Sequence, residues 1–71
     1  MNKCVDYLFE VIGEDSDLCG EQFFVEVDYT YEDDPLAVAK DIAAEHFPDE
    51  ELTCYGPFSP IYAEMCGLDT Y

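Results

Sequence analysis

The sequence contains no arginine, and its only lysines are Lys3 and Lys40. Arginine and lysine are the side chains that proteins use to hold phosphate groups, nucleic acids and anionic membrane surfaces. Their scarcity argues against a phosphorylated substrate, against direct binding to nucleic acid and against a membrane partner. The partners that remain are positively charged proteins.

Long hydrophobic runs are also missing. No stretch approaches the roughly 20 apolar residues that a transmembrane helix requires. Asp6 and Glu10 interrupt the region where the apolar part of a signal peptide would have to lie. We therefore expect a cytoplasmic protein.

The chemistry of an active site is hard to find. The sequence has no GxSxG or HExxH motif and no glycine-rich phosphate loop. The single histidine, His46, falls on the apolar side of a predicted helix, which is typical of a half-buried structural residue. A cysteine nucleophile needs an electropositive setting that so acidic a chain does not provide. We expect no enzymatic activity and no cofactor.

No two cysteines have the CxxC spacing of a structural zinc site. The four cysteines are Cys4, Cys19, Cys54 and Cys66. We expect them to be free thiols, and one or two disulfides are the alternative. Asp15, Asp17, Gly20 and Glu26 match part of an EF-hand calcium loop, but Cys19 replaces an oxygen ligand and strands are predicted where helices should flank it. We predict no metal site and keep a small calcium-binding protein as a minor alternative.

Acidic residues are what the chain has in abundance: 18 among 71 residues, for a formal net charge of -16. Hydrophobic residues make up 49% of the sequence and aromatic residues 15%, which is too apolar for a disordered acidic tail. The length indicates a single domain over residues 1–71, with a small core and either a monomeric or a homodimeric state.

Alternating apolar residues predict strands over residues 3–12 and 22–32, joined as an antiparallel hairpin. Asp34 as N-cap and Pro35 as first residue predict a helix over 35–47. A third strand is expected over 51–55, ended by Gly56 and Pro57. A short C-terminal helix is expected after Ser59, running through Met65 with Gly67 as its C-terminal stop. The fold class is α+β with ββαβ order. The first strand is central in a three-stranded antiparallel sheet, the helix packs on one face, and the connection from second to third strand is right-handed.

The other sheet face is predicted to stay open and to carry a row of carboxylates. Side chains two residues apart on a strand lie roughly 6.6 Å apart, and duplex DNA advances about 3.4 Å per phosphate on each strand. Alternating acids therefore reproduce phosphate spacing approximately. The row consists of Asp6, Glu10, Glu26, Asp28 and Glu32. Acids that would widen it are Glu14, Asp15 and Asp17 in a loop and Asp33 and Asp34 before the helix. Asp49, Glu50 and Glu51 form a second cluster.

In length, charge, lack of arginine and ββαβ order, the chain resembles the small acidic phage-encoded inhibitors that act as DNA mimics, in particular anti-CRISPR proteins. No specific motif carries this resemblance. It implies an inhibitor in the host bacterial cell that occupies the lysine- and arginine-lined DNA groove of an RNA-guided nuclease complex. Phe24, Tyr55 or Tyr71 would supply anchoring contacts. The alternatives are a module that binds another basic protein, such as a restriction enzyme, nucleoid protein or toxin, and acidity that serves only solubility or halophilic adaptation.

Overall fold

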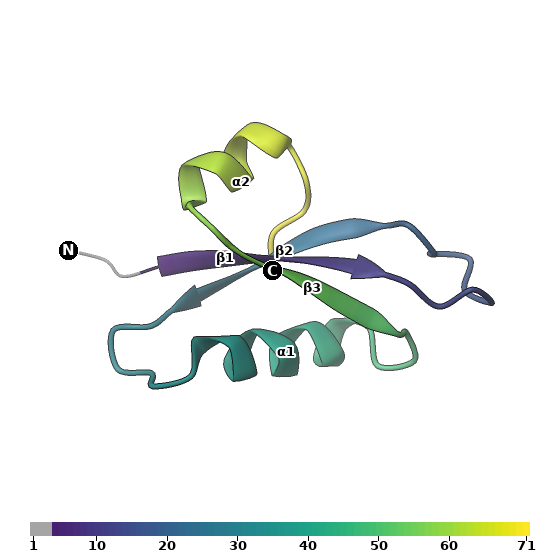
Figure 1. Cartoon of the computed structure of the whole chain (residues 1–71), viewed down its shortest axis with the longest axis horizontal. Coiled ribbons are helices and arrows are strands. Elements are labelled where there is room, and N and C mark those ends of the chain that lie inside the picture. Colours follow the sequence, from purple (N-terminus) through teal and green to yellow (C-terminus); the bar gives the residue numbers. More distant parts are fainter. Residues whose placement is uncertain (1–3) are drawn as a thin grey trace.

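The computed structural model describes residues 4–71. Its elements follow the order β1 (Cys4–Val11), β2 (Gln22–Asp28), α1 (Pro35–His46), β3 (Leu52–Phe58) and α2 (Pro60–Cys66) (Figure 1). The sheet has the strand order β2-β1-β3 with both neighbouring pairs antiparallel. The predicted α+β class, the ββαβ order and the central first strand are confirmed. Lys3, the predicted first strand residue, lies outside the described residues.

Helix α1 packs against β1 and β2 on one face of the sheet. The odd-numbered residues of β1 and β2 face it, and Tyr7, Phe9, Phe23, Val25 and Val27 are buried there. Alanines at positions 39 and 43 of α1 are fully buried. Small side chains at these positions allow a helix to lie close to a sheet. The predicted N-cap is also present, since the Asp34 side chain accepts a hydrogen bond from the Ala37 N–H at 3.2 Å.

Two strands end several residues away from the predicted position, and the other described strand bounds differ by one residue or less. Strand β2 stops at Asp28 rather than at residue 32, and Thr30 donates both its N–H and its hydroxyl to the Asp28 carboxylate. These local bonds replace the sheet ladder. Strand β3 continues through Gly56 and Pro57, which were expected to end it. Its pairing with β1 shifts register there, and Gly56 adopts a φ of 101° that suits glycine at a bulge.

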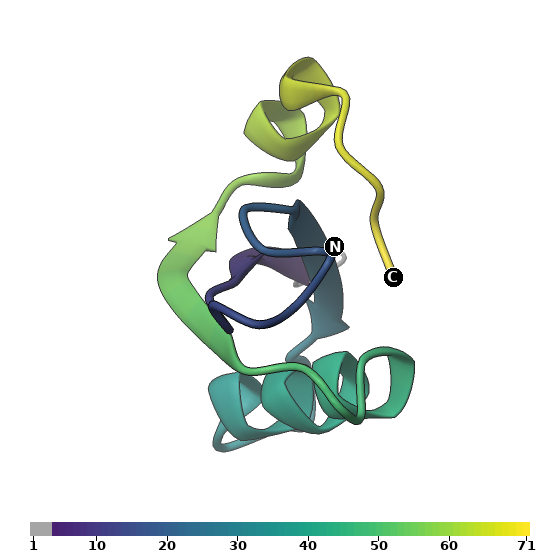
Figure 2. The same cartoon turned by 90° about the vertical axis from the view of Figure 1, so that its right-hand side faces the viewer.

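The second face of the sheet is partly covered, so the prediction that it stays open is wrong. Helix α2 crosses this face on the side opposite α1 (Figure 2). Ser59 caps its start through the Tyr62 N–H, Gly67 ends it at a φ of 69°, and Ala63 within it is buried. The predicted short C-terminal helix is thereby confirmed, and it shields an additional group of apolar side chains around Phe24.

The segment after α2 returns to the free edge of β2. The N–H of Phe24 donates to the carbonyl of Asp69, the N–H of Tyr71 donates to the carbonyl of Phe24, and the N–H of Glu26 donates to the carbonyl of Tyr71. This short parallel bridge was not expected from the sequence. Within residues 4–71, neither helix is long and apolar enough to pass through a membrane.

Candidate protein-interaction surface

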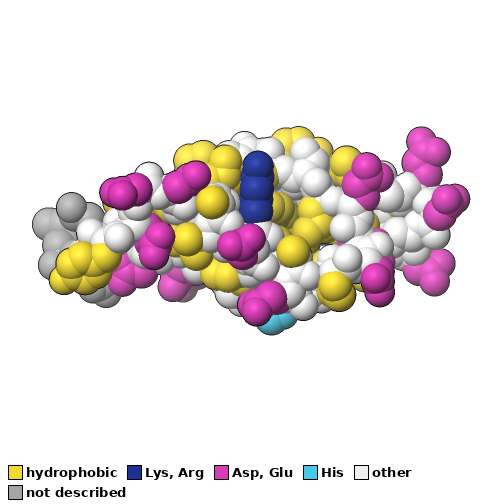
Figure 3. Space-filling view, turned by 90° about the horizontal axis from the view of Figure 1, so that it is seen from below, with side chains coloured by type: hydrophobic (Ala, Val, Ile, Leu, Met, Phe, Trp, Pro, Cys, Tyr) yellow, Lys and Arg dark blue, Asp and Glu magenta, His cyan; other side chains and the backbone are white. Residues whose placement is uncertain are grey.

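The domain is elongated, with extents of 42 × 25 × 16 Å, and its surface is acidic along the whole length. Every acidic side chain except Asp6, Glu10 and Glu50 is exposed. Among residues 4–71, Lys40 is the only lysine or arginine. On the face shown in Figure 3, acidic side chains lie along the long axis, toward both ends and also beside the single basic side chain near the middle. Two groups of these acids are brought together by the fold.

One acidic region, here called the loop end, combines two loops that are distant in sequence. Glu14 and Asp15 follow β1, whereas Asp49, Glu50 and Glu51 precede β3. Together they line an open groove of about 370 Å³. The N–H of Ile12 donates to the carbonyl of Glu51 at 2.8 Å and holds the two loops together. Sequence reasoning treated these clusters separately, because only the pairing of β1 with β3 brings them to the same end. Asp17 lies in the same β1–β2 loop but does not line this groove.

The connection between β2 and α1 carries the second acidic region, here called the turn end. It lies at the opposite end of the long axis from the β1–β2 loop (Figure 1). Glu32, Asp33 and Asp34 are exposed there, next to Asp28 at the end of β2. Two hydrogen bonds from Thr30, the hydroxyl at 2.7 Å and the N–H at 3.0 Å, hold the pKa of Asp28 below its usual range. This carboxylate is therefore both charged and fixed in position. Tyr31, 96% exposed, places an aromatic side chain in this connection.

The predicted row of carboxylates on the sheet face is only partly formed. Glu26 is exposed in the middle of β2, and Glu10 is half-buried in β1. The Glu10 carboxylate accepts a hydrogen bond from the Tyr55 hydroxyl at 3.0 Å and another from the Gln22 amide at 3.1 Å. The first of these bonds raises the pKa of the Tyr55 phenol. Glu32 lies beyond the strand, in the connection to α1, and so is not part of the row.

Asp6 departs most from the prediction, because it is only 2% exposed. It pairs with Glu26 on β2 and with Phe58 on β3, in the part of the sheet face that α2 overlies. Burial, and to a smaller extent the negative charge of Glu26, raise the pKa of the Asp6 carboxyl. Asp6 is therefore excluded from the exposed acidic surface that sequence analysis assigned to it.

Of the three predicted aromatic anchors, one is buried, one packs against other rings and one is available to a partner. Phe24 is fully buried and its ring packs edge-on against Phe58, so its assignment as an exposed anchor is wrong. Tyr71 contacts the rings of Phe23, Phe47 and His46, which gives it a structural role. Tyr55, 54% exposed beside Glu10, remains available to a partner. Sequence reasoning missed Ile61 and Met65, which are one helical turn apart and exposed on α2.

His46 is exposed rather than half-buried, although its ring lies 4.4 Å from that of Tyr71 between centroids. The four cysteines are free thiols. Burial raises the pKa of the Cys4 thiol, and the carboxylates of Asp28, Glu26 and Asp6 raise it further. Cys4 is therefore a poor nucleophile, as expected from the acidity of the chain.

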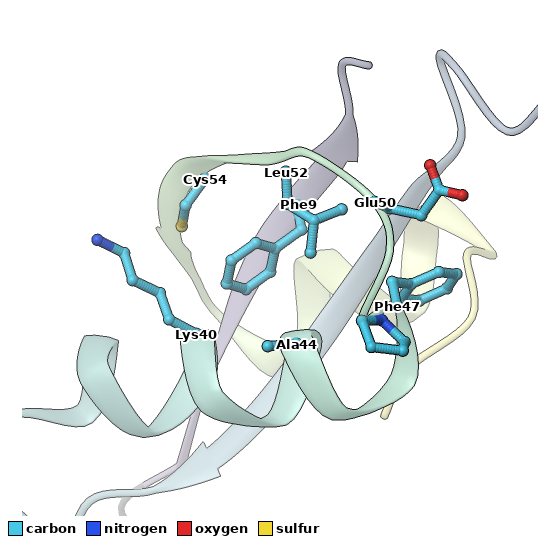
Figure 4. Close-up of a pocket in the computed structure, with 8 residues that line it drawn as sticks. Phe9, Lys40, Ala44, Phe47, Glu50, Leu52 and Cys54 are labelled. Carbon is cyan, nitrogen blue, oxygen red and sulfur yellow. The ribbon is translucent and has the colours of Figure 1, made fainter. Parts of the chain in front are cut away.

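A cavity of about 360 Å³ lies between α1 and β3 (Figure 4). Its middle is apolar, formed by Phe9 and Leu52, while Lys40 and Glu50 lie at opposite ends of the view. Cys54 lines the same cavity, and no histidine lines it. In residues 4–71 no three acidic, histidine or cysteine side chains are arranged to hold a metal ion. Glu26, from the partial EF-hand pattern, lies within β2 and opposite Asp6.

The surface thus offers exposed carboxylates at two ends, with a shorter row of carboxylates and a tyrosine between them. Exposed carboxylates attract cationic side chains and can accept hydrogen bonds from them. Comparison with protein-family models, with curated proteins and with solved structures finds no match to this chain.

Proposed function

We propose that this protein is a DNA mimic that blocks the DNA-binding groove of a basic protein complex, and that its target is an RNA-guided nuclease of the CRISPR type. The observation that carries the proposal is the extent of the acidic surface. Carboxylates are exposed at both ends of a 42 Å domain and at Glu26 on β2 between them. At about 3.4 Å per base pair, this length matches roughly 12 base pairs of duplex DNA.

Placement of the acids favours a binding role over simple solubility. Loops from two parts of the chain bring Glu14, Asp15, Asp49, Glu50 and Glu51 around one groove. Like charges gathered in this way repel one another, and repulsion destabilises the folded state. A surface designed only to remain soluble would mix both signs of charge. A cationic partner removes the repulsion, and its arginines pair with carboxylates in a bidentate geometry.

The target grooves have the matching character. RNA-guided nucleases hold their nucleic acids in positively charged channels and read a short duplex motif through arginine side chains. An acidic domain of this length would compete for those side chains before DNA arrives. Long-range attraction accelerates such an encounter and makes it sensitive to salt. The same surface suits a restriction enzyme, a nucleoid protein or a toxin, and a panel of targets separates these partners.

The test is an order-of-addition experiment with guide-loaded RNA-guided nucleases, a restriction enzyme and a nucleoid protein. We expect the protein to prevent DNA binding by at least one nuclease when added first, and to be much less effective once DNA is bound. Inhibition of the restriction enzyme or nucleoid protein alone would refute the CRISPR assignment. Failure to inhibit any member of the panel would refute DNA mimicry for these targets.

A pair of charge variants tests whether the placement of the acids matters. The loop-end variant combines Glu14→Gln, Asp15→Asn, Asp49→Asn and Glu51→Gln. The control variant removes the same amount of charge elsewhere, through Glu21→Gln, Asp41→Asn, Glu45→Gln and Asp69→Asn. We expect the loop-end variant to weaken inhibition by about tenfold or more relative to the control. Equal losses would show that net charge alone is responsible and would contradict a defined mimic surface.

A further inference from the structure

Asp6 is a buried carboxyl group without an internal partner. Its Oδ1 atom is shielded from solvent and accepts no hydrogen bond from the part of the chain that the structure describes. Buried polar atoms in folded proteins are nearly always hydrogen-bonded, and an unsatisfied one costs about 1–3 kcal/mol. An apolar residue at this position would fit the neighbouring side chains Phe58 and Ala63 at lower cost. Packing within the core therefore does not account for a carboxyl group at this position.

Asp6 also lines an open groove between α2 and the sheet, here called the Asp6 groove, with a volume of about 460 Å³. This volume lies within the usual range of ligand sites, about 300–1,000 Å³. The sheet contributes two carboxylates, Asp6 and Glu26, which face each other across β1 and β2. The opposite wall is supplied by Ala63, Glu64, Leu68 and Thr70. The groove is thus acidic on its floor and partly apolar on its wall.

We propose that the Asp6 groove receives an arginine side chain from the partner protein, whose guanidinium donates hydrogen bonds to the Asp6 and Glu26 carboxylates. This inference deepens the proposed function and rests on it for the cationic nature of the partner. The arginine donates to the Asp6 carboxylate from the groove and neutralises two carboxylates that repel each other. This one contact would fix how the two proteins are aligned, which attraction between the charged surfaces alone does not do.

Arginine fits the groove better than lysine or a metal ion. Directly opposed residues on neighbouring strands have Cβ atoms about 5 Å apart, so the two carboxyl groups present acceptors side by side to a planar fork of donors. The guanidinium is more weakly hydrated than an ammonium group and loses less on entering a half-covered groove. Ala63 and Leu68 offer apolar surface to its flat faces. A metal ion would need further ligands, and the described residues hold no group of three suitable side chains.

The experiment measures binding of N-acetyl-arginine amide by NMR chemical-shift titration at neutral pH and about 0.15 M salt. We expect saturable shifts confined to residues around the groove, on β1, β2 and α2. N-acetyl-citrulline amide has the same shape without the charge, and N-acetyl-lysine amide has the charge without the planar fork. We expect no binding of the citrulline compound and weaker binding of the lysine compound. Equal binding of arginine and lysine amides, or unsaturable shifts over the whole acidic surface, would overturn the proposal.

Three variants assign the site. Asp6→Asn keeps the shape of the side chain, and we expect it to weaken arginine binding by about tenfold or more. Glu26→Gln lies on the exposed side of the groove, provides a second test independent of the buried position, and should also weaken binding. Asp41→Asn removes one charge from the exposed surface of α1 and should leave binding unchanged. Unchanged affinity in both groove variants would refute the site.

The two proposals fail in distinguishable ways. If arginine amide binds the groove but no member of the target panel is inhibited, the proposed function is wrong and the assignment of the groove as an arginine site is retained. If a target is inhibited equally by the native chain and by Asp6→Asn, the acidic surface acts without the groove and this inference is wrong.

Discussion

Replacing Asp6 with valine should make the isolated protein more stable. Asp6 lies in a central strand and is 2% exposed, yet its Oδ1 has no hydrogen-bond partner in residues 4–71. Valine is apolar, has high β-propensity and demands no partner. Removing an unsatisfied buried group recovers about 1–3 kcal/mol at neutral pH. For a domain of this size each 1 kcal/mol shifts the melting temperature by about 4–8 °C.

The gain should depend on pH in a defined direction. Burial raises the pKa of Asp6 above its ordinary value of 3.8, so the folded state binds this proton more tightly than the unfolded state does. The associated stability is fully present below pH 3.8 and is lost as the pH rises through the raised pKa of the folded state. The free-energy advantage of Asp6→Val should therefore be small in acid and largest at neutral pH.

The assay is urea unfolding followed by circular dichroism, repeated between acidic and neutral pH, with Asp6→Asn as the companion variant. Asparagine removes the charge but retains polar atoms that need partners, so its gain should be smaller than that of valine. The slope of the unfolding free energy against urea should stay constant, because the folded surface changes little. A valine variant less stable than the native chain at neutral pH, or an advantage independent of pH, would refute the account of Asp6 as a strained buried acid.

Four further outcomes follow from the same structure. Glu26→Gln removes a negative charge opposite Asp6, so NMR titration should show the pKa of Asp6 shifted downward, and an unmoved titration would contradict their coupling. Asp28→Asn should behave oppositely to Asp6→Val. The hydrogen bonds from Thr30 lower the pKa of Asp28 below 3.8. The stabilisation by this carboxylate is therefore present above pH 3.8 and is lost as the pH falls through the lowered pKa. Asp28→Asn should accordingly be less stable than the native chain at neutral pH and equally stable in strong acid. Ser59→Ala removes the cap of α2 and should cost about 0.5–2 kcal/mol, with faster amide exchange in residues 61–66; unchanged exchange would show that the cap is not needed. Raising salt from about 0.01 M to 0.15 M should increase the melting temperature by screening the net charge of -16, whereas a flat profile would mean that the carboxylates are too dispersed to repel one another.

The sequence was most informative where local chemistry decides the structure. Asp34 and Pro35 predicted the start of α1, and Ser59 and Gly67 predicted both ends of α2. A cap and a left-handed glycine act within a few residues, so their effect is visible in the sequence itself. The alternation in β1 and β2 likewise placed the buried face correctly, because side chains on a strand point to opposite faces.

Features that depend on distant partners were not predictable. Pro57 usually ends a strand, but β3 has β1 on one side only, and an edge strand tolerates a residue without an N–H on its free side. The pattern in β2 continues to residue 32, yet the described pairing with β1 ends at Cys4 and Asp28. The burial of Asp6 and Phe24 depends on where α2 crosses the sheet, which no local signal encodes. For the same reason the sequence predicted one row of five carboxylates, whereas the fold buries Asp6 and places Glu32 beyond the end of β2.

Both lateral borders of the sheet are protected against joining another strand. Along β2, the backbone groups of Phe24 and Glu26 are engaged by the returning segment at Asp69 and Tyr71. Along β3, the bulge at Gly56 and the missing N–H of Pro57 interrupt a regular ladder. Electrostatic repulsion is therefore not the chain's sole defence against fibril formation. When acid or bound cations neutralise the carboxylates, the molecules lose their mutual repulsion but still present few free ladder positions for polymerisation.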